Sequence, residues 1–330
     1  MSWMPPLPIA SWDRERLADW LELEALASAD RSSSIEDLVG VLRRTNSVDA
    51  IEDPDDPSNE GDPGSELAQT IASSALATVE TRLEACGGAA NYPFEVQGGR
   101  ITLRDDPLTS DYVFLLLLTF VGPKYGSRKG INPAKLFEEL CTRASEGYLG
   151  GPSNKAKAFR FGAPRPSPHG RMSVALDHLC LLLNEGGGCS APEMADHNGD
   201  AQLDIVAWRE FPDRGAGKII AFGQCASGQS DVLGKMTELN AGTFILKWFR
   251  VPLAVQPIRL FFVPWNHGLQ RKTTESRHNL IDAGIIFDRC RIIACERQLE
   301  RQAVAKSQVK WSNFVLNDLK AGRMKLRRTG

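Results

Sequence analysis

The 330-residue sequence lacks several features that would assign it to a specialised class of protein. Its seven cysteines are an odd number and contain no CxxC pair, a usage typical of the reducing cytosol and not of a zinc cage. The longest apolar run, from Tyr112 to Gly122, is too short for a membrane span, which needs about 20 residues. The N-terminus shows no basic segment followed by an apolar one, so no secretion signal is expected. We therefore expect a cytoplasmic protein that does not engage a membrane.

The spacing of the histidines and glycines does not indicate a metal site or a phosphate-binding loop. The five histidines are scattered without the intervals of metal ligands, and Gly186-Gly187-Gly188 is not followed by Lys-Ser/Thr, so it is no phosphate-binding loop. What is present is ordinary globular composition, 42% hydrophobic and 24% charged, with enough apolar content for a core. The length allows about two domains.

The net charge of −2 conceals an asymmetry between the two ends. Residues 1–66 contain five basic and sixteen acidic side chains, a net charge of −11, whereas residues 301–330 contain eight basic and one acidic, a net charge of +7. Each end is either an ordinary solvated surface or a docking site, the acidic end for a protein partner and the basic end for a protein or nucleic acid.

Composition and apolar periodicity divide the chain into regions. The segment that follows Asp49 is rich in Asp, Glu, Pro and Gly and is too poor in apolar residues to order itself. The predicted regions are a helical N-terminal region (1–48), an acidic Pro/Gly-rich linker (49–66), a mainly helical region (67–125), an α/β core (126–295) and a basic helical C-terminal tail (296–330).

The core region alternates helix and strand patterns. Asn132-Pro133 is typical of a helix start, with an N-cap followed by proline at the first helical position. The other predicted elements are strands near 159–163, 203–208, 218–225, 258–263 and 285–294, and helices over 173–185 and 231–249. This order predicts one mixed sheet flanked by helices, an α/β fold.

A polar pair stands out in the predicted hairpin. Asp204 begins an apolar strand, where burying an ionised carboxylate is costly unless it is paired or binds a cation. Counting from a hairpin centre near residue 214 places Asp204 opposite Gln224, with the two side chains about 5 Å apart on one face. Carboxylate and amide oxygens suit Mg²⁺ (or Mn²⁺), which keeps several waters and takes few protein ligands.

The run GDAQLDIVAW, a short turn and then GKIIAFGQCASG resembles the PD-(D/E)XK nuclease superfamily. The resemblance is to Mrr-type restriction endonuclease-like domains, in which a GxxxxD motif begins one strand and QxK ends the next. The segment LFEEL at 136–140 resembles the superfamily's first helix, which often supplies a glutamate. The resemblance covers about residues 126–295 and implies a restriction-endonuclease-like mixed sheet, with the helical N-terminal region outside it.

The resemblance implies roles for individual residues. Asp204 matches the metal-binding carboxylate, Gln224 the second-motif ligand, and Glu138 the helix acid, with Glu139 as its rival. Asp200 is a weaker acidic candidate. Each also has a plain structural interpretation: Asp204 could hold a turn, Gln224 could be a satisfied core residue, and Glu138 could be solvated on an amphipathic helix.

The lysine of the motif is missing, because Ala226 occupies its position. Lys235, on the following helix, is the expected replacement, although taken alone it is an ordinary helix lysine. Lys218 shares the strand with Gln224 but lies six residues away, about 20 Å at about 3.3 Å per residue.

The implied function is metal-dependent hydrolysis of nucleic acid phosphodiesters, with double-stranded DNA favoured over RNA, in restriction or anti-phage defence. The expected backbone contacts are Lys155, Lys157, Arg160, Arg165, Arg171 and Ser227. The alternative is a catalytically inactive nuclease-like module that binds nucleic acid or serves in assembly, and a third is an unrelated α/β scaffold. Ala226 supports the inactive module.

Overall fold

The structure is a computed structural model and falls into two units. The terminal unit comprises residues 1–121 together with 304–330, and the central unit comprises residues 122–303. The described residues are 12–45, 63–104, 106–128, 130–165, 167–197, 199–228, 232–266, 281, 283–299 and 304–322. The predicted linker at 49–66 therefore lies mostly outside the described residues, and its last four residues begin helix α3.

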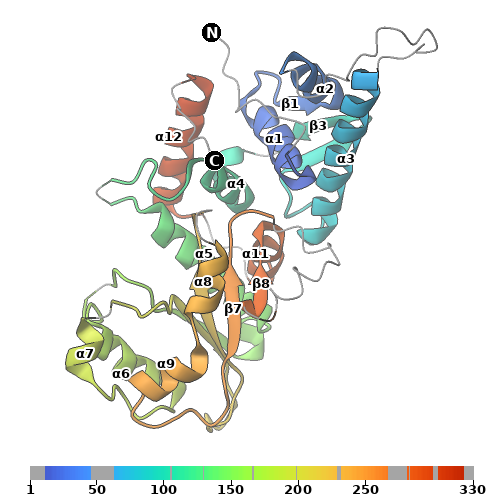
Figure 1. Cartoon of the computed structure of the whole chain (residues 1–330). Coiled ribbons are helices and arrows are strands. Elements are labelled where there is room, and N and C mark those ends of the chain that lie inside the picture. Colours follow the sequence, from blue (N-terminus) through green and yellow to red (C-terminus); the bar gives the residue numbers. More distant parts are fainter. Residues whose placement is uncertain are drawn as a thin grey trace. The chain divides into compact units, whose positions relative to one another are not determined.

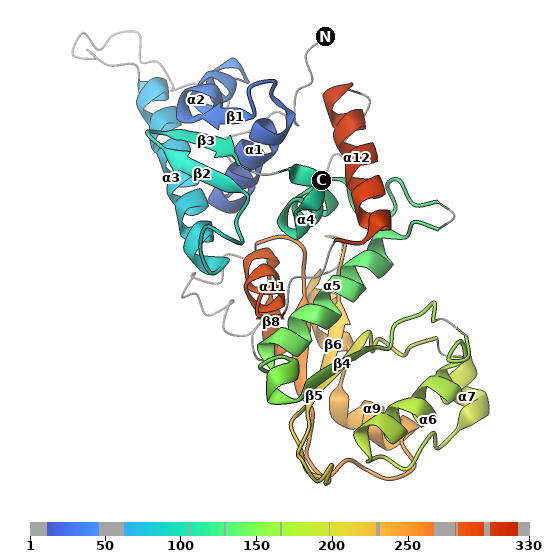
Figure 2. The same ribbon diagram turned by 180° about the vertical axis from the view of Figure 1, so that it is seen from behind.

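The terminal unit combines helices with a small antiparallel sheet of order β1-β3-β2 (Figures 1 and 2). Its elements are α1 (Arg14–Ala27), β1 (Ser32–Ser34), α2 (Ile35–Arg44), α3 (Pro63–Ala85), β2 (Phe94–Gln97), β3 (Arg100–Leu103), α4 (Asp111–Val121) and α12 (Lys306–Lys320). Helix α2 begins with a capping box, in which the Ser34 hydroxyl accepts from the Asp37 N–H and the Asp37 carboxylate accepts from the Ser34 N–H.

The C-terminal helix packs into the terminal unit and is not a separate tail. The buried Trp311 ring lies edge-on to Phe114 with centroids 5.2 Å apart. Gln308 Nε2 donates to Asp111 Oδ1 at 2.7 Å in a buried contact. The apolar face of α12 thus places residues 304–322 in a core that the first 121 residues also build, so the division differs from the predicted separate region 296–330.

Acidic residues of the N-terminal region surround one buried cation. Arg82 of α3 contacts Glu15, Asp19 and Glu22 of α1 at 3.0, 2.8 and 2.9 Å. The hydroxyl of Tyr92 donates to Glu22 at 2.5 Å. Part of the negative charge that the sequence concentrates here is therefore neutralised inside the unit and is not offered to a partner.

The central unit has a mixed five-stranded sheet of order β4-β5-β6-β7-β8, which confirms the predicted α/β fold with a helical N-terminal region (Figure 1). Strands β4, β5 and β6 pair antiparallel, and β6, β7 and β8 pair parallel. Its elements are α5 (Pro133–Tyr148), β4 (Ala156–Arg160), α6 (Met172–Leu183), α7 (Pro192–Asp196), β5 (Ile205–Arg209), β6 (Ile220–Cys225), α8 (Val232–Glu238), α9 (Ala241–Trp248), β7 (Ile258–Phe262), β8 (Ile285–Phe287) and α11 (Arg289–Glu296).

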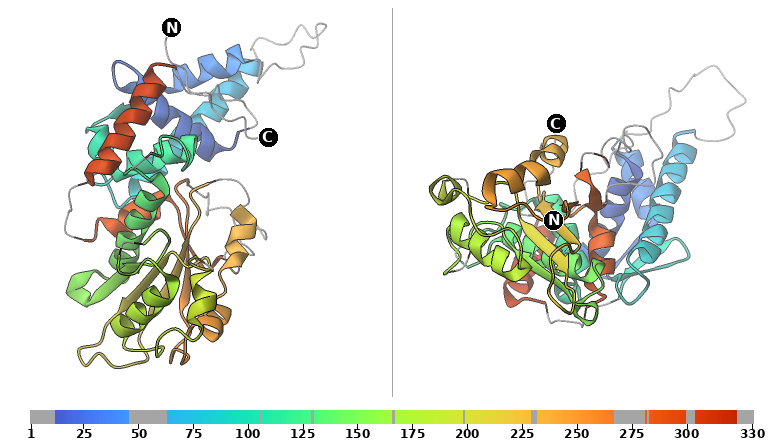
Figure 3. Two further views of the ribbon diagram at one scale, coloured as in Figure 1. Left: turned by 90° about the vertical axis from the view of Figure 1, so that its left-hand side faces the viewer. Right: turned by 90° about the horizontal axis from the view of Figure 1, so that it is seen from below.

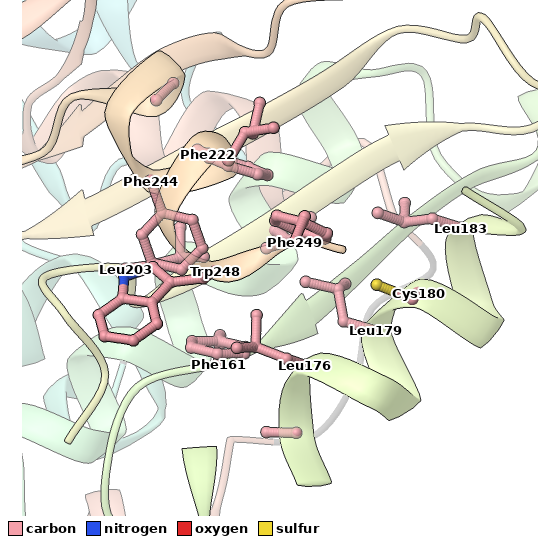
Figure 4. Packing of buried hydrophobic residues seen from close by; sticks show 14 of the residues in the cluster. Phe161, Leu176, Leu179, Cys180, Leu183, Leu203, Phe222, Phe244, Trp248 and Phe249 are labelled. Atoms are coloured by element: carbon pink, nitrogen blue, oxygen red, sulfur yellow. The ribbon is translucent and has the colours of Figure 1, made fainter. Parts of the chain in front are cut away.

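The two faces of this sheet carry different helices. Helix α5 (green) and helix α8 (gold) lie on opposite sides (Figure 3). Side chains that alternate along β6 divide accordingly: Phe222 packs on Phe244 of α9, with ring centroids 5.6 Å apart, in a cluster that α6 completes (Figure 4). Cys225 faces α5, where it lies beside the buried Cys141.

Local capping overrides two sequence predictions. The predicted strand over 285–294 is wrong beyond Phe287, because the Asp288 side chain accepts from the Arg291 N–H and starts helix α11. The single helix predicted over 231–249 is divided, because Asn240 caps a second helix by accepting from the Thr243 N–H at 2.9 Å.

Among the helices that the structure describes, none has the length and apolarity to cross a membrane.

Candidate active site

The site lies where β4, β5 and β6 approach the middle of α5. The predicted hairpin register is confirmed: Ile205 pairs with Gly223 and Val206 with Phe222, so the next residues outward are Asp204 and Gln224. The prediction that Asp204 and Gln224 lie opposite each other on neighbouring strands therefore holds for the backbone.

The Asp204 side chain does not follow the strand alternation. Asp204 precedes the first residue of β5, and its N–H donates to the Gly223 carbonyl at 2.9 Å. Its Oδ2 accepts from the Cys225 N–H at 2.7 Å, so a side-chain oxygen replaces a backbone carbonyl at this point of the ladder. This placement turns the carboxylate away from the face that its position in the pairing would assign.

Gly162 shows where the Asp204 carboxylate goes. A Cβ placed on Gly162 would lie 3.0 Å from Asp204 Oδ1 and 2.7 Å from Glu138 Oε2. Two carboxylates, one from the sheet and one from α5, therefore converge on a backbone position without a side chain. The proposed helix acid and the strand acid are brought together, as the sequence predicted.

Gln224 is not part of this group. Its Nε2 donates to Glu238 Oε2 of α8 at 2.8 Å, and its partner in β7 is Phe261, which packs with Met236 of α8. Since α8 lies across the sheet from α5, the expectation that Asp204 and Gln224 share one face is wrong. The physical reason is that Gln224 is held in the regular ladder, whereas Asp204 lies just outside it.

Glu138 is selected over Glu139 by the helix that carries both. Asn132 caps α5 by accepting from the Lys135 N–H, and Pro133 occupies the first turn, as predicted. Glu138 then faces the sheet, and its Oε2 accepts from Arg160 Nη1 at 2.7 Å. Glu139 faces outward and lies 3.7 Å from Lys135, with both side chains about 40% exposed.

Arg160, one of the predicted phosphate contacts, is also engaged within the protein. Its guanidinium donates to Glu138 and to the backbone carbonyls of Gly162 and Pro164, each at 2.7 Å. It therefore ties α5 to the loop that follows β4 and places a positive charge at the edge of the carboxylate pair. No local pattern predicts this pairing, because Glu138 and Arg160 are brought together only by helix-on-sheet packing.

Asp200 lies close enough to act on the pair electrostatically. Its carboxylate accepts from the N–H groups of Ala163 and Gln202, both at 3.1 Å. These bonds hold the loop before β5 against the loop after β4. The weaker acidic candidate is therefore near the site and is occupied with backbone contacts.

The pKa values of Asp204 and Glu138 are both raised, as expected where too little positive charge is present to stabilise two ionised carboxylates. Burial raises the pKa of the Asp204 carboxyl well above its ordinary value, and the Glu138 carboxylate raises it further. Burial also raises the pKa of Glu138, opposed by its hydrogen bond from Arg160. Asp200 adds a further raising effect on both pKa values. A cation on this pair would offset the cost of holding both carboxylates ionised.

Neither Lys235 nor Lys218 lies where it could replace the lysine that the motif lacks at Ala226. Ala226 is buried with Met236 and Phe261 on the α8 face. Lys235 lies on α8, across the sheet from Glu138, so it does not replace the missing lysine beside the pair. Lys218 is buried at the other end of β6, where its Nζ donates to Glu210 at 2.5 Å.

The remaining predicted contact residues are dispersed. Lys155 and Lys157 lie towards the opposite end of β4 from Arg160, and Lys157 Nζ is 3.9 Å from Glu210. Arg165 donates to the carbonyls of Phe161, Gly170 and Gly199 and stays near the site. Arg171 pairs with Asp196 at 3.8 Å, and Ser227 follows β6 in the loop that leads to α8.

Comparisons with known proteins add no assignment: no family model, no curated protein and no solved structure matches this chain. Within the described part of the chain, no group of three or more His, Cys, Asp or Glu side chains is placed to hold a metal ion. Because Gln224 bonds Glu238 of α8, the predicted three-ligand set of Asp204, Gln224 and Glu138 is not assembled, and Asp204 and Glu138 remain together.

Proposed function

We propose that the central unit is a metal-dependent nuclease whose site is the Glu138–Asp204 carboxylate pair. The single observation that carries the proposal is the convergence of the two carboxylates on Gly162. Two buried acids beside each other are costly to ionise without a cation. Helix α5 precedes strands β4, β5 and β6, with α6 and α7 inserted between β4 and β5, and the mixed sheet flanked by helices agrees with the architecture that the sequence resemblance implies.

Two of the three predicted ligands are in place, and they are suitable for Mg²⁺ or Mn²⁺. Mg²⁺ is commonly held by one or two carboxylates, with waters and substrate phosphate oxygens completing its shell. Glu138 and Asp204 supply those carboxylates, and Gln224 does not take part. The ion would polarise the scissile phosphate and lower the pKa of an attacking water.

The chain's own residues would orient the substrate. Arg160, held by Glu138 and two carbonyls, presents a fixed positive charge beside the pair. Arg165 donates to three backbone carbonyls, which do not neutralise its charge. A phosphodiester approaching the pair would meet both guanidiniums, which offset negative charge that develops at the phosphate.

The proposed substrate is DNA ahead of RNA, and the proposed setting is restriction or anti-phage defence, both from the family resemblance alone. All seven cysteines are free thiols, which supports a cytoplasmic location. A protein partner could dock on the exposed acids of the N-terminal region or on the basic C-terminal residues.

A second candidate function is an inactive nuclease-like module that binds nucleic acid. It is favoured by the buried Ala226 at the lysine position and by Gln224 facing α8. Such a module would retain Arg160 and Arg165 for binding without turnover.

The test uses the full chain with labelled DNA and RNA and a titration of Mg²⁺ or Mn²⁺. Wild type is compared with Asp204→Asn, which keeps the acceptor for the Cys225 N–H, and with Glu138→Gln. The nuclease proposal expects metal-dependent cutting that both variants lose. It also expects Mg²⁺ to raise the Tm of wild type and not of Asp204→Asn. Binding without cutting and without a Mg²⁺-dependent Tm shift would establish the inactive module instead.

A further inference from the structure

A shallow hollow opens at the edge of the sheet next to the carboxylate pair. It has a volume of about 270 Å³ and is bounded by α5, by the edge strand β4 and by the loop after β4. Arg160 lines the hollow and also bonds Glu138, so one side chain joins the hollow to the proposed site.

The lining is predominantly positive. Lys135 of α5, Arg160 of β4 and Arg165 of the following loop contribute cations, and Glu139 contributes the one carboxylate among the described lining residues. Lys135 and Glu139 are a partly exposed pair 3.7 Å apart, an arrangement that contributes little to stability. The hollow therefore offers a surplus of positive charge to an anionic ligand.

Aromatic rings supply the rest of the wall. Phe159 of β4 and His169 of the loop line the hollow, with ring centroids 6.5 Å apart and planes at 84°, so a planar ligand that stacks on one ring meets the edge of the other. His169 is held in place by stacking on His178 of α6, with centroids 4.1 Å apart and planes at 23°. The loop ring is thus braced by a helix, which gives a planar ligand a fixed surface.

We propose that this hollow binds one unpaired nucleotide of the substrate strand, its base against the Phe159 and His169 rings and its phosphate against the cations. The inference rests on the proposed nuclease function and specifies its substrate as nucleic acid with a single-stranded end or gap. Aromatic faces with cations are the usual chemistry for holding unpaired bases. Arg160 then connects the bound nucleotide to the carboxylates that would act on a neighbouring phosphate.

The hollow suits an unpaired base better than a paired one. A volume of about 270 Å³ is of the order of one nucleotide, and a base pair within a duplex presents its stacked faces to its neighbours and not to the protein. A blunt duplex would have to release a base to use the hollow, at a cost in free energy. A duplex with a single-stranded overhang already has an unpaired base and needs no such release.

The test measures binding in EDTA, so that no cutting occurs. Fluorescence anisotropy compares a labelled single strand, a blunt duplex and the same duplex with a single-stranded overhang, each against the full chain. The single strand and the overhang are expected to bind about tenfold more tightly than the blunt duplex. Equal affinity for the blunt and overhang duplexes would overturn the inference.

Substitutions at two residues that line the hollow test whether the single strand binds there. Lys135→Ala is expected to weaken single-strand binding about fivefold and to reduce the salt dependence by about one charge, whereas Glu139→Gln is expected to strengthen binding. A purely structural role for this exposed pair would move both variants in the same direction. Lys247→Ala, a matched loss of charge on α9, is expected to bind as wild type does.

The outcomes separate the two proposals. If Lys135→Ala and Glu139→Gln bind the single strand as wild type does, the hollow is not the binding site, whatever the metal titration shows. If they shift binding in opposite directions while no metal-dependent cutting is found, the nucleotide site stands and the nuclease proposal fails.

Discussion

The carboxylate of Asp204 accepts a hydrogen bond from the backbone N–H of Cys225 at 2.7 Å. This one bond replaces a backbone partner at the end of the β5–β6 ladder and directs the carboxylate to the α5 side of the sheet. It decides that Asp204 meets Glu138 and not Gln224.

The first prediction concerns the glycine between the two carboxylates. Gly162→Ala would place a methyl group 2.7 Å from Glu138 Oε2 and 3.0 Å from Asp204 Oδ1, so the pair must separate. We expect the Mg²⁺-dependent rise in Tm to fall to near zero and any cutting to drop by at least about tenfold. Thermal unfolding with and without Mg²⁺, together with a cleavage assay, checks this.

Gly170→Ala is the matched control for that variant, because nothing lies within 4 Å of a Cβ at Gly170. It is expected to behave as wild type in both assays. A Gly162→Ala protein that retained the full Mg²⁺ shift would contradict the assignment of the site.

The second prediction separates the sequence motif from the geometry. Gln224→Leu removes the motif residue on the α8 face, where its Oε1 is buried without a hydrogen-bond partner in the described structure. We expect cutting within about twofold of wild type and little change in stability, because a lost hydrogen bond is offset by relief of an unsatisfied acceptor. Loss of Mg²⁺-dependent cutting equal to that of Asp204→Asn would show that Gln224 acts in the site after all.

The third prediction concerns the buried cation of the terminal unit. Arg82→Met leaves Glu15, Asp19 and Glu22 facing one another without a counter-charge. Removing one partner of a buried charge group costs about 3–5 kcal/mol in the free energy of unfolding. Urea unfolding checks this, with Arg82→Lys as a control that keeps the charge and should lose less. A loss below about 1 kcal/mol would contradict the assigned role of Arg82.

The fourth prediction is a pH dependence of stability. Burial, with the nearby carboxylates of Asp37 and Asp30, raises the pKa of Glu24 to about 7. The folded state therefore holds this proton more tightly than the unfolded state does, so the stability that Glu24 contributes is present at pH 4 and is lost as the pH rises towards 7.

Glu24→Gln should lack this loss. We expect the free energy of unfolding to fall between pH 5 and pH 8 by on the order of 1 kcal/mol more in wild type than in the variant, allowing for solvent screening of a partly exposed group. Chemical unfolding at the two pH values measures the difference. Parallel pH profiles for the two proteins would contradict the raised pKa.

Much of the secondary structure was predictable because local signals determine it. The Ser34 and Asp37 capping box, the Asn132-Pro133 helix start and the alternation in β5 and β6 each depend on residues a few positions apart. Helix α11 was missed because its apolar residues also suit a strand, and only the Asp288 cap decides between the two. The hairpin register was predictable because it follows from the length of the connection.

Local patterns along the chain are sufficient to predict the α/β class, the register that sets Asp204 opposite Gln224, and the helix that carries Glu138. The tertiary structure alone decided which acids meet, because side-chain direction at a strand end depends on one backbone hydrogen bond that alternation does not encode. It also decided that Arg160 pairs with Glu138 and that α12 joins the first 121 residues, since both contacts depend on the packing of segments far apart in the chain.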